Sequence, residues 1–498
     1  MQIKITIVLV LLYSVSLNLL ADTVIINNVN IVSTTEARIL QHRHVLLQDG
    51  LIKKISKTPI IASAAAKLID AKDRYLIPGL IDSHVHLAKV PGMNRRQQKM
   101  HPQLVESYID QQPRSYLYFG YTTLIDLNVF SPSLINRFKQ TPLHPDVFTC
   151  GQHLDIANGH GMFEEPVETR LVDNPNFLYD HHQKQIIPDN FDLTKHTPAA
   201  TVAALKADNA ICVKTYYENG YGGSEVADYD IPSYQIIREV VSEAKKRNLP
   251  VVLHANSWES YRFALLANVD ILGHGLWHWG EYRHDTEVPT AIQATLQEIA
   301  KRQIGYQPTM HVIASQRALF DPKYLNNPLL VNAYPSELLS WYKTEEGGWF
   351  KEYIKKYLPS HMQNYDHETL YKLFDGFLTH TGKALEVMSQ HEGNLLLGTD
   401  TIIGQSYANA PGYSGFEEMQ AWYKFGVPLD KILKAATIGN AKAFNLDKQY
   451  GTVEEGKKAN LLLLRSNPLA TLSAYNEIDI VFLAGTAIQR ETLSAQEQ

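Results

Sequence analysis

The sequence has few cysteines and, beyond its N-terminus, no long apolar run. Only Cys150 and Cys212 occur among its 498 residues, too few for a scaffold held by several disulfides. Both lie in apolar runs typical of strands, VFTC and ICVK. We therefore expect two buried free thiols, with a bridge between the strands as the alternative. After the N-terminus, no segment is long and apolar enough to span a bilayer.

The chain also lacks an excess of positive charge. Its net charge of −6 and its 20% of charged residues give no electrostatic reason to bind nucleic acid. It has no glycine-rich phosphate loop of the Walker type and no placed pair of carboxylates, which argues against nucleotidyl enzymes and glycosidases. We expect a small-molecule or peptide substrate. The oligomeric state stays open, a homo-oligomer included.

The N-terminus has the pattern of an export signal. Lys4 precedes an apolar stretch that ends at the small residue Ala21, which is typical of a secretory signal peptide. We expect a signal peptide at residues 1–21, export to the periplasm or the medium, and no stable membrane insertion after cleavage. An uncleaved membrane anchor is the alternative.

Both ends of the remaining chain are rich in short β-like runs. Residues 22–77 contain such runs, separated by Asn-Asn, Asp-Gly and Pro-Gly turn signals, and the same texture returns in residues 447–498. Runs of this kind predict strands joined by tight turns. We expect the two ends to build one small β-sandwich domain together.

The middle of the chain alternates strand-like and helix-like segments. This alternation within residues 78–446 predicts an α/β fold, a (β/α)8 TIM barrel. Residues 311–393 read as mostly helical and are too long for a bare loop, so we expect a cap over the barrel mouth. The predicted strands are 80–87, 121–127, 146–151, 210–217, 250–256, 269–275, 304–310 and 394–400, and the clearest predicted helices are 232–247, 289–302 and 430–444.

Metal-ligating residue types recur at the ends of these strands. His84 and His86 lie two residues apart and so project to the same face of a strand. His254, His274 and Asp400 close three other predicted strands. Strand ends in a TIM barrel converge on one mouth, so the pattern predicts a shared metal site. Taken singly, each residue has a structural alternative, a hydrogen-bonded core histidine or a helix-capping aspartate.

Several motifs resemble those of the amidohydrolase superfamily. The strings IPGLIDSHVHL, GYTTLIDL, GTD and GTVEEGKKANLLLL carry this resemblance, which runs from about residue 24 to 486. The branch that it resembles most is the imidazolonepropionase-like and prolidase-like one, which includes Xaa-Pro dipeptidases. The sequence departs at Asn460, where the family usually has Asp, but that position lies in the small β-domain, away from the expected site.

The resemblance implies a binuclear metal site. Lys214 ends the fourth predicted strand inside an apolar run, where an unpaired ammonium would be costly to bury. In this branch a lysine at that place is carboxylated, and its carbamate bridges two divalent ions. A lysine that reaches the mouth or pairs with an acid is the alternative. Such ligands suit zinc, although manganese, iron or cobalt could also bind. The implied ligands are His84, His86 and Asp400 for one ion, His254 and His274 for the other, and carbamylated Lys214 for both.

The implied reaction is hydrolysis of a C–N amide bond in a dipeptide or N-acyl amino acid by a metal-bridging hydroxide. We expect Asp400 to shuttle the proton. His160 is expected to support the carbonyl oxygen, with a plain loop histidine as the alternative. Tyr216 and Tyr217 are expected to bind a substrate carboxylate, with core packing as the alternative.

Other functions of the superfamily fit less well. Its deaminases usually carry a glutamate three residues after the strand-five histidine, where this chain has Ser257. A cyclic amidase or lactonase on the same two ions is the main alternative. A non-catalytic barrel used for binding is a further one, against which the full ligand set argues.

Overall fold

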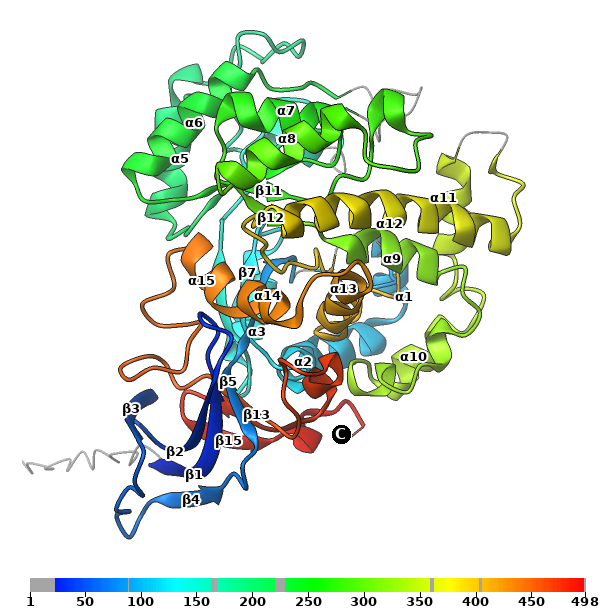
Figure 1. Ribbon diagram of the computed structural model, residues 1–498. Helices are drawn as coiled ribbons and strands as arrows, with labels where there is room; N and C mark the ends of the chain where they lie inside the picture. The colour runs from blue at the N-terminus through cyan, green and yellow to red at the C-terminus, as the bar shows by residue number, and fades with distance from the viewer. Residues whose placement is uncertain are drawn as a thin grey trace, which may run out of the picture.

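The computed structural model describes residues 23–87, 89–162, 166, 168–219, 229–358, 362–402 and 405–496 (Figure 1). The expected signal peptide at residues 1–21 lies outside these described residues. Among the helices that are described, none combines the length and the apolar character needed to cross a bilayer.

The two ends of the chain form one eight-stranded sheet. Its order is β15-β14-β13-β5-β1-β2-β3, with β4 paired to β1, and the antiparallel pairing of β13 with β5 joins the two ends. Figure 1 shows this sheet at one end of the molecule. A sandwich is not confirmed, because the strands are linked in one sheet. The strands are β1 Val24–Val32, β2 Ile39–Gln48, β3 Leu51–Ser56, β4 Lys67–Asp70, β5 Tyr75–Pro78, β13 Leu461–Leu464, β14 Ile478–Leu483 and β15 Thr486–Gln489.

Seven of the eight predicted central strands are present, and all pair in parallel. They form two sheets, β6-β7-β8 and β12-β11-β10-β9. Their side chains are buried, as expected where helices cover a parallel sheet, except those of β8, which are half-buried. The strands are β6 Leu80–Val85, β7 Tyr121–Asp126, β8 Asp146–Thr149, β9 Val213–Tyr216, β10 Val251–His254, β11 Ile271–Gly273 and β12 Gly305–Gln307.

Amphipathic helices connect these strands. The helix predicted at 232–247 is α6, which the Ser233 hydroxyl caps by accepting a hydrogen bond from the amide of Ile236. Its predicted apolar stripe is buried. The helices are α1 Arg95–Met100, α2 Pro102–Tyr118, α3 Pro132–Gln140, α4 Arg170–Asp173, α5 Pro198–Ala207, α6 Tyr234–Lys246, α7 Trp258–Ala267, α8 Thr290–Lys301, α9 Met310–Ala318, α10 Ser336–Tyr342, α11 Phe350–Tyr357, α12 His367–Gln390, α13 Tyr413–Lys424, α14 Leu429–Lys434 and α15 Asn440–Ala443, the last two joined by a π-helical turn, Ala435–Gly439.

The predicted eighth strand, 394–400, is wrong as a strand. This segment is irregular, and Asp400 has a φ of 59°, which lies outside the β region. The segment nevertheless bonds to both sheets: the amide of Leu396 donates to the carbonyl of Tyr306 (2.9 Å), and the amide of Asp400 donates to the carbonyl of His84 (2.7 Å). It fills the gap between β12 and β6, so the fold is TIM-barrel-like without being one continuously paired barrel.

A disulfide crosses the other gap, between β8 and β9. Cys150 and Cys212 are bonded across a separation of 62 residues, so the expectation of two free thiols is wrong. The physical reason is register: the amide of Ile211 donates to the carbonyl of Thr149 (2.9 Å), and this brings the two cysteine Cα atoms to 4.5 Å, within bonding range.

The terminal sheet is attached to the starting end of β8. Asn460 Nδ2 donates to Oδ2 of Asp146 (2.8 Å), and Lys458 Nζ pairs with the same carboxylate (2.6 Å). Asp146 is the first residue of β8, whereas the predicted metal ligands lie near strand C-terminal ends. The departure from the family pattern at Asn460 therefore falls at the opposite end of the strands from the site.

Candidate metal centre

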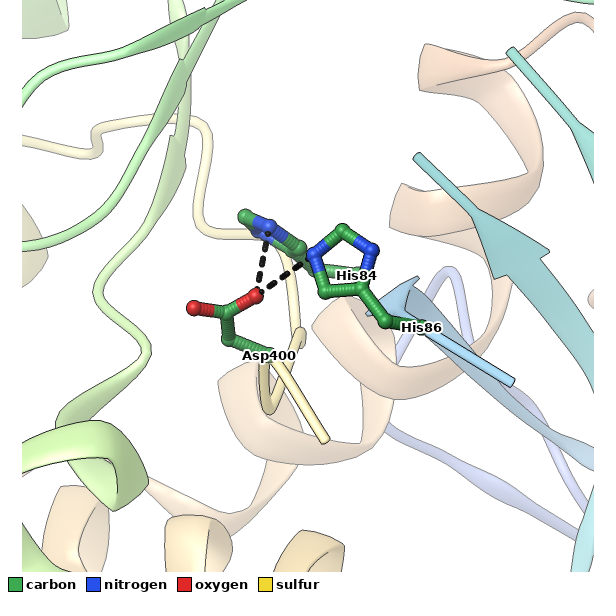
Figure 2. A group of neighbouring side chains, drawn as sticks. All are labelled: His84, His86 and Asp400. Atoms are coloured by element: carbon green, nitrogen blue, oxygen red, sulfur yellow. Dashed lines mark ion pairs between the residues drawn. The ribbon is translucent and has the colours of Figure 1, made fainter. Parts of the chain in front are cut away.

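Two histidines of β6 and its C-terminal end converge on one carboxylate oxygen, as Figure 2 shows. Oδ1 of Asp400 lies 3.1 Å from Nε2 of His84 and 2.9 Å from Nε2 of His86. All three side chains are buried. The other ring nitrogen of each histidine, Nδ1, is buried without a hydrogen-bond partner. The sequence predicted a shared site from the spacing of His84 and His86 and from the position of Asp400 at another strand end, and the structure brings the three together.

Two neighbouring residues fix this arrangement. Oδ1 of Asp82 accepts hydrogen bonds from the amides of His84 (3.2 Å) and Thr399 (3.1 Å), and its Oδ2 accepts one from the Thr399 hydroxyl (2.6 Å). At Gly398, a Cβ would lie only 2.7 Å from Cβ of His84, so a larger residue would push Asp400 away. Asp82 stood in the recognised motif, but the sequence alone assigned it no role.

The other predicted ligands surround this triad. The ring of His274 lies 5.0 Å from that of His84 and 4.4 Å from that of His254, measured between centroids. Nζ of Lys214 is 3.5 Å from Nε2 of His84. All six predicted ligands line one cavity of about 680 Å³, so residues from five separate segments meet as expected.

Three residues of the centre have left-handed backbone conformations. The φ angles are 59° at Asp400, 118° at His274 and 41° at Thr309, whose hydroxyl lies 2.8 Å from Nδ1 of His274. Such conformations cost about 1–3 kcal/mol each in non-glycine residues and concentrate at functional sites, where the surroundings enforce them. Holding these side chains in place therefore lowers the stability of the fold.

Burial sets the charge states of the centre. It lowers the pKa of His84 to about 3, with the nearby charge of Lys214 acting in the same direction. It also lowers the pKa of Lys214 to about 8. Burial alone would raise the pKa of Asp400, but the charges and hydrogen bonds of His84 and His86 hold it well below its usual range. A neutral imidazole and an ionised carboxylate are the forms that bind metal.

The predicted substrate-binding residues divide into two groups. His160 and Tyr216 line the cavity, and the His160 ring lies 4.9 Å from that of His254 and 5.7 Å from that of Tyr216. The ring of Tyr217 instead packs on Phe263 at 4.7 Å and is not among the cavity-lining residues that the structure describes. Tyr217 follows the last residue of β9, and its packing gives no support to the expected substrate contact.

Sequence reasoning missed two buried residues here. Oε2 of Glu218, a residue only 2% exposed, lies 3.1 Å from Nε2 of His254 and accepts a hydrogen bond from Nδ2 of Asn256 (2.6 Å). His153 lines the cavity, and neither of its ring nitrogens has a hydrogen-bond partner. The one available signal was position: Glu218 follows Lys214 by four residues, and His153 comes soon after β8.

The donor set fits divalent metal ions. Within the described residues, two groups of three present ligand atoms within 4.8 Å of one another: His84, His86 and Asp400, and His160, Glu218 and His254. Imidazole nitrogen and carboxylate oxygen are the ligands that zinc and similar ions take in proteins. The unpartnered Nδ1 atoms of His84 and His86 and the close approach of three ligand side chains support a cation site at this cluster.

The 311–393 segment is mostly helical. Its long helix α12 packs against α9 and α8, and α10 contacts α2. The described residues that line the cavity come mainly from β6 and the residues just after it, from the loops that follow β7 and β8, from α3, from the ends of β9, β10 and β11, and from Asp400 in the segment 394–400. The expected cap over the mouth is therefore not supported.

Comparison with known sequences gives a family and partial relatives. The profile of the amidohydrolase family matches residues 75–275 and 378–488, more than half of the chain. A dihydroorotase of Trichlorobacter lovleyi is 45% identical over 53 residues, 11% of this chain and 12% of that protein. A 5-methylthioadenosine/S-adenosylhomocysteine deaminase of Pyrococcus furiosus is 28% identical over 166 residues, 31% of this chain and 38% of that protein. The chain thus matches well under half the length of these relatives.

Solved structures match over almost the whole chain. A putative prolidase from Bifidobacterium longum aligns with a TM-score of 0.61 and 18% identity over 94% of both chains. A Xaa-Pro dipeptidase with bound methionine aligns with a TM-score of 0.60 and 17% identity over 94% of this chain and 100% of that one. An ochratoxinase of A. niger aligns with a TM-score of 0.61 and 18% identity over 94% and 96%. At these identities the likeness shows the TIM-barrel-like fold.

Proposed function

This chain belongs to the amidohydrolase family, hydrolases that act on carbon–nitrogen bonds, and from that premise we propose that it hydrolyses the amide bond of a dipeptide or an N-acyl amino acid. The single observation that carries the proposal is the convergence of Nε2 of His84 and Nε2 of His86 on Oδ1 of Asp400 at 2.9–3.1 Å. The prolidase and dipeptidase among the structural neighbours support a substrate of this kind.

Two divalent ions, preferably zinc, would be held by the predicted ligand set. His84, His86 and Asp400 would hold one ion, and His254 and His274 the other. The amine of Lys214 is buried, and its pKa is lowered to about 8 by that burial, so roughly a tenth of it is neutral at pH 7 and can react with carbon dioxide. As a carbamate, Lys214 would carry the negative charge that lets it serve both ions.

When bound, such ions activate water near neutral pH and polarise a carbonyl oxygen. Asp400 supplies the proton transfer. Because its pKa is held well below the usual range by the charges around it, it is ionised at neutral pH and able to accept a proton from the attacking water. The same carboxyl group would then deliver that proton to the leaving amine.

Residues at the cavity wall would hold the substrate. Burial lowers the pKa of His160 to about 3, so its ring is neutral and can donate one hydrogen bond to the carbonyl oxygen. Tyr216 lies beside it in the cavity lining and can bind a carboxylate through its hydroxyl. The ring of Tyr217 packs on Phe263, so we assign it no substrate contact.

A substrate screen tests the proposal. Metal-replete protein should release amino acids from a library of dipeptides and N-acyl amino acids, and chelation should abolish the release. Lactones and cyclic imides belong in the same screen, because a cyclic amidase or lactonase would use the same attack on a carbonyl. Turnover of those compounds alone would replace the proposed substrate class, and no metal-dependent turnover of any kind would remove the enzyme.

We also propose that the protein works in an oxidising compartment, the periplasm or the medium. The Cys150–Cys212 disulfide supports this, because disulfides persist in exported proteins and are rare in the cytosol. Fractionation of cells that express the full chain tests it. The protein should be recovered outside the cytoplasm with the disulfide formed, and recovery in the cytoplasm with free thiols would contradict the proposal.

A further inference from the structure

A buried carboxylate contacts one of the proposed metal ligands. Glu218 follows the end of β9 and is 2% exposed, and its Oε2 lies 3.1 Å from Nε2 of His254. His254 lines the cavity, as does the neighbouring His160, whereas Glu218 is not among the described residues of that lining. Ligand atoms of His160, Glu218 and His254 lie within 4.8 Å of one another, so Glu218 can either orient His254 or bind an ion itself, and its hydrogen bonds distinguish the two roles.

A second contact of Glu218 indicates whether Glu218 or His254 donates the hydrogen bond between them. The amide nitrogen Nδ2 of Asn256 donates to the same oxygen, Oε2, at 2.6 Å. An oxygen that accepts at so short a distance is typical of an ionised carboxylate, which has no proton to give. The hydrogen of this pair consequently sits on Nε2 of His254.

A neutral imidazole carries one N–H and one lone pair. With its hydrogen on Nε2, His254 has its lone pair on Nδ1 alone, so only Nδ1 can bind an ion. His274 is engaged at the opposite atom: its Nδ1 lies 2.8 Å from the hydroxyl of Thr309, which leaves Nε2 available. The two rings lie 4.4 Å apart between centroids. Glu218 contacts the ring of His254, and Thr309 contacts the ring of His274.

From this geometry we infer that Glu218 is a positioning residue that fixes the tautomer and ring orientation of His254, so that Nδ1 is presented to the second metal ion. The inference rests on the proposed function, because it gives His254 its role as a ligand. It adds a residue that neither the motifs nor the family resemblance assigned. Carboxylates that orient ligating histidines in this way commonly change metal affinity or activity 10- to 100-fold when removed.

Glu218→Gln tests the inference, because glutamine keeps the shape and removes the charge. We expect it to bind the second equivalent of metal about 10- to 100-fold more weakly, measured by titrating the metal-free protein with Co²⁺ and following the visible absorption of the bound ion. The first equivalent, at His84, His86 and Asp400, should be unaffected. Glu218→Asp should partly restore the second.

Glu417→Gln is the matched control. Glu417 also contacts a buried histidine, with Oε2 3.6 Å from Nδ1 of His311, and it accepts a hydrogen bond from the hydroxyl of Tyr324 (3.1 Å). Neither Glu417 nor His311 is among the described residues lining the cavity. This variant should bind both equivalents like the wild type, which separates loss of orientation from general damage to the core.

A double variant distinguishes positioning from direct ligation. If Glu218 acts only through His254, then Glu218→Gln should weaken metal binding no further once His254→Ala is present. A further loss in the double variant would show that Glu218 binds the metal itself and would overturn the inference, as would wild-type binding by Glu218→Gln alone. Wild-type protein that binds no metal would instead remove the proposed function, so the two failures are distinguishable.

Discussion

Nζ of Lys214 and Nε2 of His84 lie 3.5 Å apart, although 130 residues separate them in the chain. Both groups are buried, and a buried ammonium is costly unless an anion lies close by. Asp400 is the neighbouring anion, since its Oδ1 lies 3.1 Å from the same nitrogen. A carbamate on Lys214 would invert the charge of the lysine and explain its position.

Replacing Lys214 should therefore remove the metal as well as the activity. We expect Lys214→Ala and Lys214→Arg both to lose metal and turnover, because neither can form a carbamate. Elemental analysis and turnover of the best dipeptide measure this. An active Lys214→Arg that holds two equivalents would show instead that a plain positive charge is enough at this position.

Asp400→Asn should lower kcat by at least about 100-fold at equal metal content, because the amide cannot accept the proton from water. KM should change little, since substrate contacts remain. Steady-state kinetics on protein of matched metal loading check this. A fall of less than about tenfold would assign the proton transfer to another group.

Tyr216→Phe and Tyr217→Phe form a matched pair. Tyr216 lines the cavity, whereas Tyr217 packs on Phe263. Loss of one hydrogen bond to a substrate carboxylate should raise KM about tenfold in Tyr216→Phe, and Tyr217→Phe should leave KM unchanged. Equal values for both variants would contradict a substrate contact by the Tyr216 hydroxyl.

These comparisons show what the sequence could predict. The spacing of His84 and His86 determined their shared direction, because side chains two apart on a strand must face the same way. The direction of the Tyr217 side chain depended on where β9 ends. The run KTYYEN contains no residue that marks the end of the strand. The contact between Glu218 and His254 could not be predicted, because it joins two strand ends whose separation only the packed fold defines.

The disulfide was beyond the sequence for a similar reason, since pairing depends on the register of β8 against β9. Its removal should be costly. For a 62-residue separation, the chain-entropy model gives about 4 kcal/mol of stabilisation. The Cys150→Ala, Cys212→Ala double variant should lose free energy of unfolding of that order in urea and become insensitive to reductant, while wild-type protein with reductant should match it. No loss of stability would show that strain in the native state offsets the gain.

The stability of the fold should depend on pH through His311. Its ring is buried, with Nε2 3.1 Å from the carbonyl of Ala408, and burial lowers its pKa to about 4. The unfolded chain binds a proton below about pH 6.5, so the stability due to this group is complete above that pH and is lost as the pH falls toward 4. The shift corresponds to roughly 3 kcal/mol at most.

His311→Gln should flatten this dependence, because glutamine does not titrate but can still donate to Ala408. Urea unfolding of both proteins between pH 7 and about pH 4.5 measures the difference. Parallel curves for the two proteins would show that His311 does not couple folding to protonation.

The segment 394–401 has two structural roles. Its backbone joins β12 to β6, and its Asp400 carboxylate completes the triad with His84 and His86. Inserting or deleting a single residue there would shift the carboxylate and would also break the hydrogen bonds that join β12 to β6. Insertions and deletions should therefore be tolerated in the surface loops of this protein but not in this short stretch, because the same residues join the two sheets and place a predicted metal ligand.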